Sequence, residues 1–218
     1  MENIKFIGQE KLVENLYVYC QAAIAREEVL DHTIISGKPG MGKTTLAKII
    51  ANKINSEIIF TNGTNFEKQA NLISVISRLK EGQILFIDEI HRINKNIEEI
   101  LYTVMEENRL DIVLGDGNEK RVISIDIPPF TLIGATTIIG NLSDPFLSRF
   151  GIELIMDDYN DKESVLIIDN ELNKYGFEIC DDGKLSLEVI EVDAKKGIVT
   201  TKALNNHYLS NNKAVNVP

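Results

Sequence analysis

The sequence contains few cysteines and histidines. Cys20 and Cys180 stand far apart in a chain of 218 residues, and neither belongs to a C-x-x-C pair. Two isolated thiols do not make a disulfide framework and indicate a reducing compartment, which predicts a cytoplasmic protein. With only three histidines, the chain also lacks the ligand clusters that are typical of a structural zinc site.

Long apolar runs and an excess of positive charge are also missing. No apolar stretch approaches the roughly 18 residues that cross a bilayer, and Met1–Lys5 does not begin a signal peptide, so we expect no membrane partner. The formal net charge is −10, so any contact with nucleic acid would need a local basic patch. Length and composition fit one sizeable globular domain with a small appendage.

One stretch that is present organises the chain, a glycine-rich phosphate loop. Residues Gly37–Thr45 read G-K-P-G-M-G-K-T-T and satisfy G-x-x-x-x-G-K-[ST] in full. Glycines let successive N–H groups face phosphate oxygens, while Lys43 reaches the β- and γ-phosphates and the Thr44 hydroxyl suits Mg²⁺. A β-branched run before the loop and a helical pattern after it disfavour the alternative, a turn without ligand. The predicted ATP contacts are Gly37, Pro39, Gly40, Met41, Gly42, Lys43, Thr44 and Thr45.

A second signal follows about forty residues after the loop. Ile84–Glu89 is a nearly continuous apolar run that ends in Asp88 and Glu89, which is typical of a buried parallel strand with carboxylates at its carboxyl edge. Asp88 suits the Mg²⁺ sphere, and Glu89 suits a base that polarises the attacking water. The alternative is two acids that merely cap a strand. For His91, which comes next, we expect only a local packing or hydrogen-bonding role.

Three further features lie downstream. Another buried-type strand ends at Thr136 and Thr137, whose hydroxyls are expected beside the phosphate loop, where they orient water. The two alternating arms of Leu110–Ile125 predict a β-hairpin, and a docking surface and a hairpin covered by the domain's own core are equally compatible with it. Arg149 is by itself an ordinary charged residue.

Taken together, the motifs resemble those of one family. They run in the order F-I-G-Q, G-K-P-G-M-G-K-T-T, F-I-D-E-I-H-R, P-P-F-T-L-I-G-A-T-T and S-R-F-G, from Phe6 to Gly151. Over about Phe6 to Tyr159 the chain closely resembles the RuvB family of AAA+ ATPases, which drive branch migration of Holliday junctions with the partner protein RuvA. D-E-I-H-R and P-P-F-T-L-I-G-A-T-T at this spacing favour this family over another class of AAA+ ATPase, the clamp-loader-like proteins.

The resemblance implies a fold and a set of roles. The fold expected is α/β, a P-loop AAA+ parallel sheet flanked by helices, with a small, divergent C-terminal helical lid. Asp88, Glu89 and Thr137 would be catalytic as Walker B and sensor 1, and Arg149 would be an arginine finger for a neighbouring subunit. Ile7 and Tyr159 would lie near adenine. The expected partners are its own copies in a ring, as a hexamer, RuvA at the hairpin Leu110–Ile125, and Holliday junction DNA.

The C-terminal part departs from the family pattern. We predict an ATPase domain over 1–158 and a diverged lid over 159–218, with no winged-helix DNA-binding domain. Thr200 or Lys202 stands where the family has its sensor-2 arginine. From Gly151 onward the acidic residues are nearly twice as many as the lysines and arginine is missing, which predicts weak DNA binding without RuvA. The alternative to a motor subunit is a truncated relative that binds nucleotide without effective motor activity.

Overall fold

A computed structural model describes residues 6–114, 121–174, 187–193 and 198–203. The chain separates into two compact units, Met1–Asn160 and Asp161–Pro218. The predicted division into 1–158 and 159–218 as an ATPase domain and a lid stays a prediction. Among the described helices, none is both long and apolar enough to cross a bilayer.

A parallel five-stranded sheet forms the centre of the first unit. Its order is β2-β3-β6-β1-β7, and every pair of neighbours is parallel. β1, β3 and β6 consist almost wholly of buried residues, as the apolar runs predict. The bounds are β1 Thr33–Ser36, β2 Ile58–Asn62, β3 Ile84–Asp88, β6 Thr131–Thr136 and β7 Ile152–Ile155. We did not predict β7, whose burial alternates as in a strand with one solvent face.

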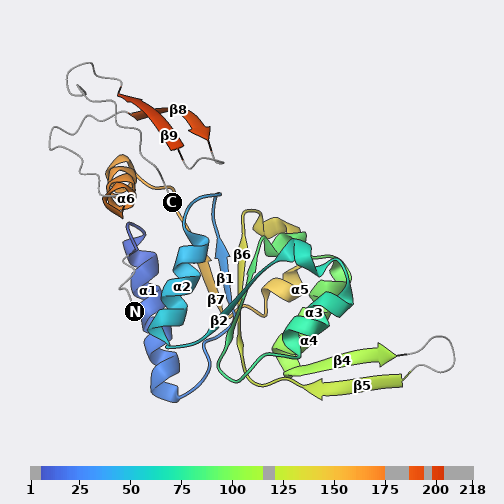
Figure 1. Ribbon diagram of the computed structural model, residues 1–218. Coiled ribbons are helices and arrows are strands. Elements are labelled where there is room, and N and C mark those ends of the chain that lie inside the picture. Colours follow the sequence, from blue (N-terminus) through green and yellow to red (C-terminus); the bar gives the residue numbers. More distant parts are fainter. Residues whose placement is uncertain (1–5, 115–120, 175–186, 194–197, 204–218) are drawn as a thin grey trace. The chain divides into compact units, whose positions relative to one another are not determined.

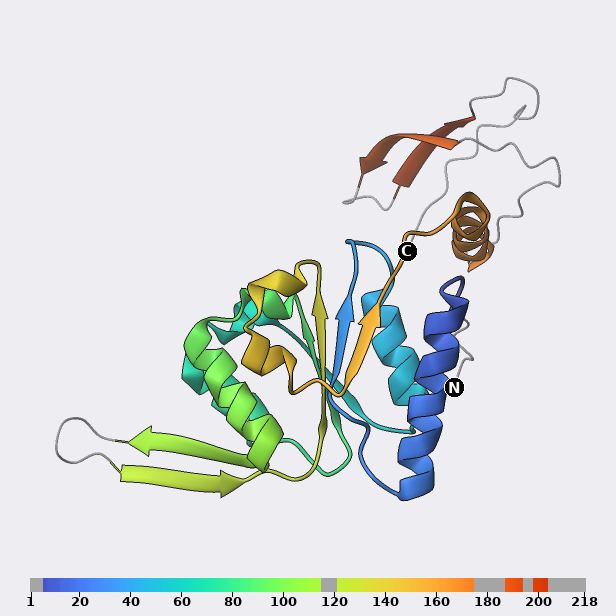
Figure 2. The same cartoon turned by 180° about the vertical axis from the view of Figure 1, so that it is seen from behind.

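Helices cover both faces of this sheet (Figures 1 and 2). One face carries α1 and α2, and the other carries α3, α4 and α5. Because neighbouring residues of a strand point to opposite faces, Ile35 packs in the core cluster of α1 and α2, whereas Ile34 packs in that of α3 and α4. The bounds are α1 Glu10–Arg26, α2 Lys43–Lys53, α3 Gln69–Ile76, α4 Lys95–Glu107 and α5 Asp144–Leu147. This is the expected P-loop arrangement.

Among the described residues, three short 3-10 helices follow the carboxyl ends of strands in the parallel sheet. They are η1 Gly63–Phe66 after β2, η2 Ile90–Arg92 after β3, and η4 Ile139–Asn141 after β6. Each one turns the chain back at the same edge of the sheet, since the strands are parallel. Residues next to these turns are therefore brought together although they are distant in the sequence.

The predicted hairpin is present as β4 Arg109–Leu114 and β5 Arg121–Asp126, which pair antiparallel. It extends away from the sheet beyond α4 (Figure 1). Its base is buried, with Leu110 only 1% exposed, whereas Val122 and Ile123 are 62% and 47% exposed. The predicted turn at 115–118 lies outside the described residues. The hairpin is thus covered at its base and exposed along β5.

The second unit begins with α6 Asp161–Lys174, which matches the expected first lid helix. Its other described elements are strands, β8 Leu187–Asp193 and β9 Ile198–Ala203, which pair antiparallel. This differs from the helical lid that we expected. Both segments are rich in valine, isoleucine and threonine, whose β-branched side chains favour strands over helices. Thr200 and Lys202 both lie on β9, and their role as sensor 2 stays a prediction.

Cys20 is fully buried on α1. Burial raises the pKa of its thiol to about 11, and the nearby Lys53 lowers it only in part. The thiol is therefore protonated and unreactive near neutral pH. Cys180 lies outside the described residues.

Candidate nucleotide-binding site

The sheet topology brings three predicted segments to one edge. The phosphate loop follows β1, the acids end β3, and Thr136 and Thr137 end β6. β6 pairs with β1 on one side and β3 on the other, so its threonines lie between the loop and the acids. Open parallel sheets bind ligands at this edge.

The loop uses its glycines for close approach and for turning. Gly40 and Gly42 have φ of 78° and 92°, which side-chain-bearing residues rarely adopt. A β-carbon on Gly37 would lie 2.9 Å from Cβ of Met156, and one on Gly42 would lie 3.2 Å from the Phe6 ring. The Gly37 N–H donates to the carbonyl of Thr136 at 3.2 Å, which ties the start of the loop to β6.

Lys43 lies at the start of α2 and is only 7% exposed. Its ammonium donates to the loop carbonyls of Gly37 at 2.8 Å and Lys38 at 2.9 Å. Burial lowers the pKa of Lys43, and the negative charges of Glu89 and Asp88 act in the opposite direction. The lysine charge is thus held inside the loop and within the field of the acid pair.

The other predicted loop residues take two kinds of position. Pro39 and Gly40 form an exposed turn, whereas Thr44 and Thr45 are half-buried in the first turn of α2. Met41 is buried, and its carbonyl accepts a hydrogen bond from the Tyr159 hydroxyl at 2.8 Å. Tyr159 is thereby attached to the loop, although 118 positions separate it from Met41.

A reciprocal contact fixes the N-terminal segment, which we did not predict. The Gln9 side chain accepts from the Asp157 N–H at 3.1 Å and donates to the Asp157 carbonyl. Phe6 packs against the core cluster of α1 and α2, and Ile7 is half-buried. The segment that precedes α1 is therefore held beside the chain that follows β7, next to the phosphate loop.

The two acids are oriented differently. The Asp88 carboxylate accepts a hydrogen bond from the backbone N–H of Glu89 at 3.0 Å, so one of its oxygens is directed toward the backbone at the end of β3. Glu89 has a left-handed backbone conformation with φ 48° and a side chain that is 29% exposed. Its Oε2 accepts a hydrogen bond from the Thr137 hydroxyl at 3.4 Å. The structure therefore brings Glu89 and Thr137 together.

Sequence reasoning missed the place of His91 in this cluster. Nδ1 of His91 lies 3.2 Å from Oε2 of Glu89 and 2.9 Å from the hydroxyl of Thr136. We had expected no more than a local role for His91. The sequence places His91 three positions after Asp88, but this spacing does not show that the ring turns back toward β6.

Arg149 lies just after α5 and contacts α4 rather than the acid pair. Its guanidinium donates to the Tyr102 hydroxyl at 2.5 Å and pairs with Glu106, also at 2.5 Å. The hydrogen bond to Tyr102 is the main cause that raises the pKa of Arg149, and the charge of Glu106 adds to it. Within the described part of the chain, the buried Nε of Arg149 has no hydrogen-bond partner.

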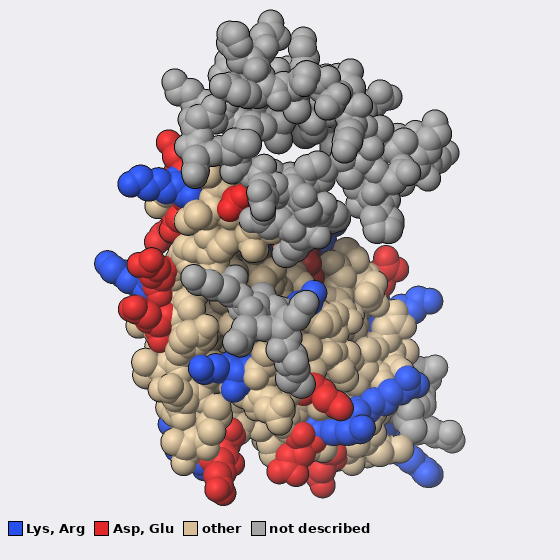
Figure 3. All heavy atoms as spheres, turned by 60° about the vertical axis from the view of Figure 1, so that its left-hand side comes forward, with Lys and Arg blue, Asp and Glu red and all other residues tan. Residues whose placement is uncertain are grey.

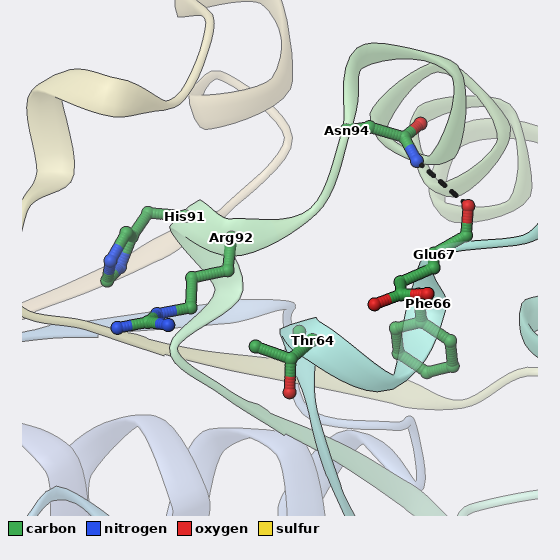
Figure 4. Close-up of a pocket in the computed structure, with 7 residues that line it drawn as sticks. Thr64, Phe66, Glu67, His91, Arg92 and Asn94 are labelled. Atoms are coloured by element: carbon green, nitrogen blue, oxygen red, sulfur yellow. Dashed lines mark hydrogen bonds between the residues drawn. The ribbon is translucent and has the colours of Figure 1, made fainter.

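A pocket of about 660 Å³ adjoins the cluster on the side of η1 and η2 (Figure 4). The Asn94 side chain donates to the carbonyl of Glu67 across one end of it. No residue of the phosphate loop contributes to its walls. The lining residues are Gly63, Thr64, Phe66, Glu67, His91, Arg92 and Asn94.

Acidic and basic side chains are interspersed on the face that Figure 3 shows. In the face that Figure 3 shows, the described lysines and arginines alternate with acids and form no continuous basic area. The described part of this face therefore has no continuous positively charged surface of the kind that attracts nucleic acid without sequence preference.

Comparison with known proteins agrees with the geometry. The family described as "Holliday junction DNA helicase RuvB P-loop domain" matches residues 2–156. Holliday junction branch migration complex subunit RuvB of Phytoplasma mali is 52% identical over 164 residues, 75% of this chain and 49% of that protein. The same subunit of Fervidobacterium nodosum is 46% identical over 183 residues, 84% of this chain and 53% of that protein.

The fold agrees as well. A solved structure of the Thermotoga maritima RuvB Holliday junction branch migration motor superposes with a TM-score of 0.70 at 44% identity, over 81% of this chain and 54% of that one. The chain spans about half the length of the curated relatives it matches. The phosphate loop, the acid pair and the strand-end threonines lie within the matched residues, and the chain belongs to the RuvB family, of which it contains the P-loop domain.

Proposed function

We propose that this chain is the ATP-hydrolysing part of a RuvB-type motor subunit that drives branch migration of Holliday junctions. One observation carries the proposal. Lys43, Glu89 and Thr137 arrive from three different strand ends at one edge of the sheet, and the charges of the acids reach the buried lysine. A cation for phosphate and a carboxylate for water are the two groups that hydrolysis of ATP requires.

The loop residues suit a nucleotide with its metal ion. The backbone of Gly37–Thr45 at the start of α2 presents N–H groups to phosphate, and Lys43 exchanges its carbonyl contacts for phosphate oxygens. The Thr44 hydroxyl and the half-buried Asp88 carboxylate are oxygen donors of the kind that Mg²⁺ prefers. When bound, Mg²⁺ would neutralise part of the phosphate charge.

Glu89 is the residue that acts on water. Its carboxylate accepts a hydrogen bond from a water whose oxygen attacks the γ-phosphorus, as the bond from that phosphorus to the β–γ bridging oxygen breaks. The proton of the water moves toward Glu89, and the electrons of the broken bond remain on the leaving diphosphate. Thr137 helps to hold the carboxylate at the place where the attack occurs.

Arg149 acts on a neighbouring subunit in this proposal. Its described contacts, with Tyr102 and Glu106, keep it on α4 rather than beside Lys43 of its own subunit. A guanidinium on this surface reaches the γ-phosphate held by the next copy when subunits form a ring, which we expect to be a hexamer. Such a residue contributes roughly 10³–10⁵ in rate.

The hairpin and the DNA complete the proposal. Exposed Val122 and Ile123 on β5 offer an apolar docking surface for RuvA. Holliday junction DNA is the substrate in the cytoplasm, bound weakly by this part of the chain because its formal net charge is −10.

Separate measurements of binding and hydrolysis test the function. For Lys43→Ala we expect loss of ATP binding, measured by anisotropy of a fluorescent ATP analogue. For Glu89→Gln we expect unchanged binding and a rate of phosphate release that is lower by about 100-fold or more, because the amide cannot act as a general base. Wild-type protein that binds ATP but releases no phosphate would favour the alternative, a nucleotide-binding relative without motor activity. Unchanged affinity in Lys43→Ala would contradict the phosphate site itself.

A further inference from the structure

The His91 ring is held between a buried hydroxyl and the Glu89 carboxylate. Its side chain is 9% exposed, and its Nδ1 lies 2.9 Å from Oγ1 of Thr136 and 3.2 Å from Oε2 of Glu89. Thr136 is fully buried, and its Oγ1 also accepts the N–H of Ile138 at 3.0 Å. The hydroxyl that anchors the ring is therefore itself fixed by the backbone.

The two contacts decide which nitrogen of His91 carries hydrogen. An ionised carboxylate can only accept hydrogen bonds. A bare lone pair on Nδ1 at 3.2 Å from Oε2 would repel it, so Nδ1 carries a proton and shares it between Glu89 and Thr136. His91 is consequently a donor to the carboxylate that polarises water.

Glu89 needs such a donor. Its side chain has several rotatable bonds, it is partly exposed, and its contact with Thr137 is long at 3.4 Å. A carboxylate that is held through one oxygen by a rigid ring presents its other oxygen in a defined direction. The ring supplies this rigidity because it bridges η2 and the end of β6.

We propose that His91 is a positioning residue that holds the Glu89 carboxylate in the orientation from which it polarises the attacking water. This inference rests on the proposed function, since it assigns the support of its catalytic base. His91 also lines the pocket at η1 and η2. A role in packing alone would be served equally by an apolar ring of similar size.

Two substitutions separate a donor from a packing residue. His91→Phe keeps a ring but has no donor, whereas His91→Asn places an amide N–H close to the position of Nδ1. We expect His91→Phe to lower kcat by about 10- to 100-fold, as a misplaced catalytic group does, with KM and ATP affinity unchanged. His91→Asn should recover most of the lost kcat. A kcat within about 2-fold of wild type for His91→Phe, or no recovery in a folded His91→Asn, overturns the proposal.

A double-mutant cycle tests whether His91 acts through Glu89. In single-turnover experiments on the Glu89→Gln protein, adding His91→Phe should slow hydrolysis by no more than about 2-fold, because the carboxylate that it would misplace is already gone. Losses that multiply in the double variant would show that His91 acts on something else and would overturn the proposal. Thermal unfolding and ATP-analogue binding of each variant establish that it is folded.

The same data distinguish this inference from the proposed function. Wild-type hydrolysis that is lost in Glu89→Gln but unaffected by His91→Phe supports the function and rejects the role of His91. Absence of hydrolysis in the wild-type chain overturns both.

Discussion

Gly63 lies where β2 ends and η1 begins, directly against the backbone of Glu89. A β-carbon at Gly63 would stand 2.5 Å from the Glu89 carbonyl oxygen, which also accepts the N–H of Arg92 at 2.9 Å. A flexible side chain could move aside, but a backbone carbonyl at the start of η2 cannot do so without shifting Glu89. The space around one small residue thus sets the position of a larger one.

We therefore expect Gly63→Ala to lower the free energy of unfolding by about 1–3 kcal/mol and to reduce ATP turnover as well. Gly140→Ala is the matched control, since a β-carbon there meets no atom within 4 Å. Gly140→Ala should change the free energy of unfolding by no more than about 0.5 kcal/mol. Urea unfolding and phosphate release measure both variants. Equal stability of the two variants would show that η2 adapts, and that the close approach of Gly63 to the Glu89 carbonyl does not affect stability.

At the scale of elements, the hairpin β4–β5 is joined firmly to the domain while its outer strand is exposed. Leu110 is buried against the core, and Ile127 after β5 donates its N–H to the Asn108 carbonyl at 2.7 Å. The Ser124 hydroxyl donates to the Asp111 carboxylate across the pair, and the Arg109 guanidinium donates to the same carboxylate along β4, which stiffens the base of the hairpin. A rigid arm with exposed apolar residues is suited to docking a partner.

The docking role predicts an effect of charge on this arm. Val122→Glu should weaken binding to RuvA by about 10-fold or more, because the acid would be buried without a partner in the complex. Val18→Glu on α1 is the control, since Val18 is 63% exposed and Val122 62%. Both variants should retain ATP affinity and thermal stability. Titration calorimetry with RuvA would contradict the prediction if the two variants bound alike.

At the scale of the whole molecule, the proposed role of Arg149 would require two subunits to complete the reaction. Arg149 contacts α4 of its own subunit through Tyr102 and Glu106, and its raised pKa keeps it charged at any physiological pH. If its target is a phosphate on the neighbouring copy, hydrolysis requires assembly, and the rate per subunit depends on concentration.

We expect ATP turnover per subunit to rise with protein concentration and to fall by roughly 10³-fold or more in Arg149→Ala, with binding of the ATP analogue unchanged. Arg26→Ala is the control, because it removes an exposed arginine on α1 that pairs only with Glu28, at 2.9 Å, within the described ion pairs. Turnover that is independent of concentration, or equal in the two variants, would reject a role for Arg149 in trans.

Much of the site could be predicted from local patterns. The phosphate loop and the acid pair are contiguous motifs whose chemistry depends on residues a few positions apart. The strand and helix predicted on either side of the loop, and the strand predicted before the acids, were confirmed as β1, α2 and β3. Thr137 was predicted from its place at a strand end, and it lies at Glu89. The contacts that hold these groups could not be predicted, because they join positions 45 to 148 apart, as in His91 with Thr136 and Gln9 with Asp157.

The sequence by itself determined the type of fold and the family, and it supplied the residues of the proposed chemistry, because apolar periodicity and motif spacing act over short stretches of chain. The tertiary structure alone decided how the groups are oriented: that β6 lies between β1 and β3, that His91 turns toward Glu89, and that Arg149 rests on α4. It also decided that β8 and β9 are strands where a helical lid was expected. Orientation depends on the order in which strands pair and on packing between distant segments, which no local pattern records.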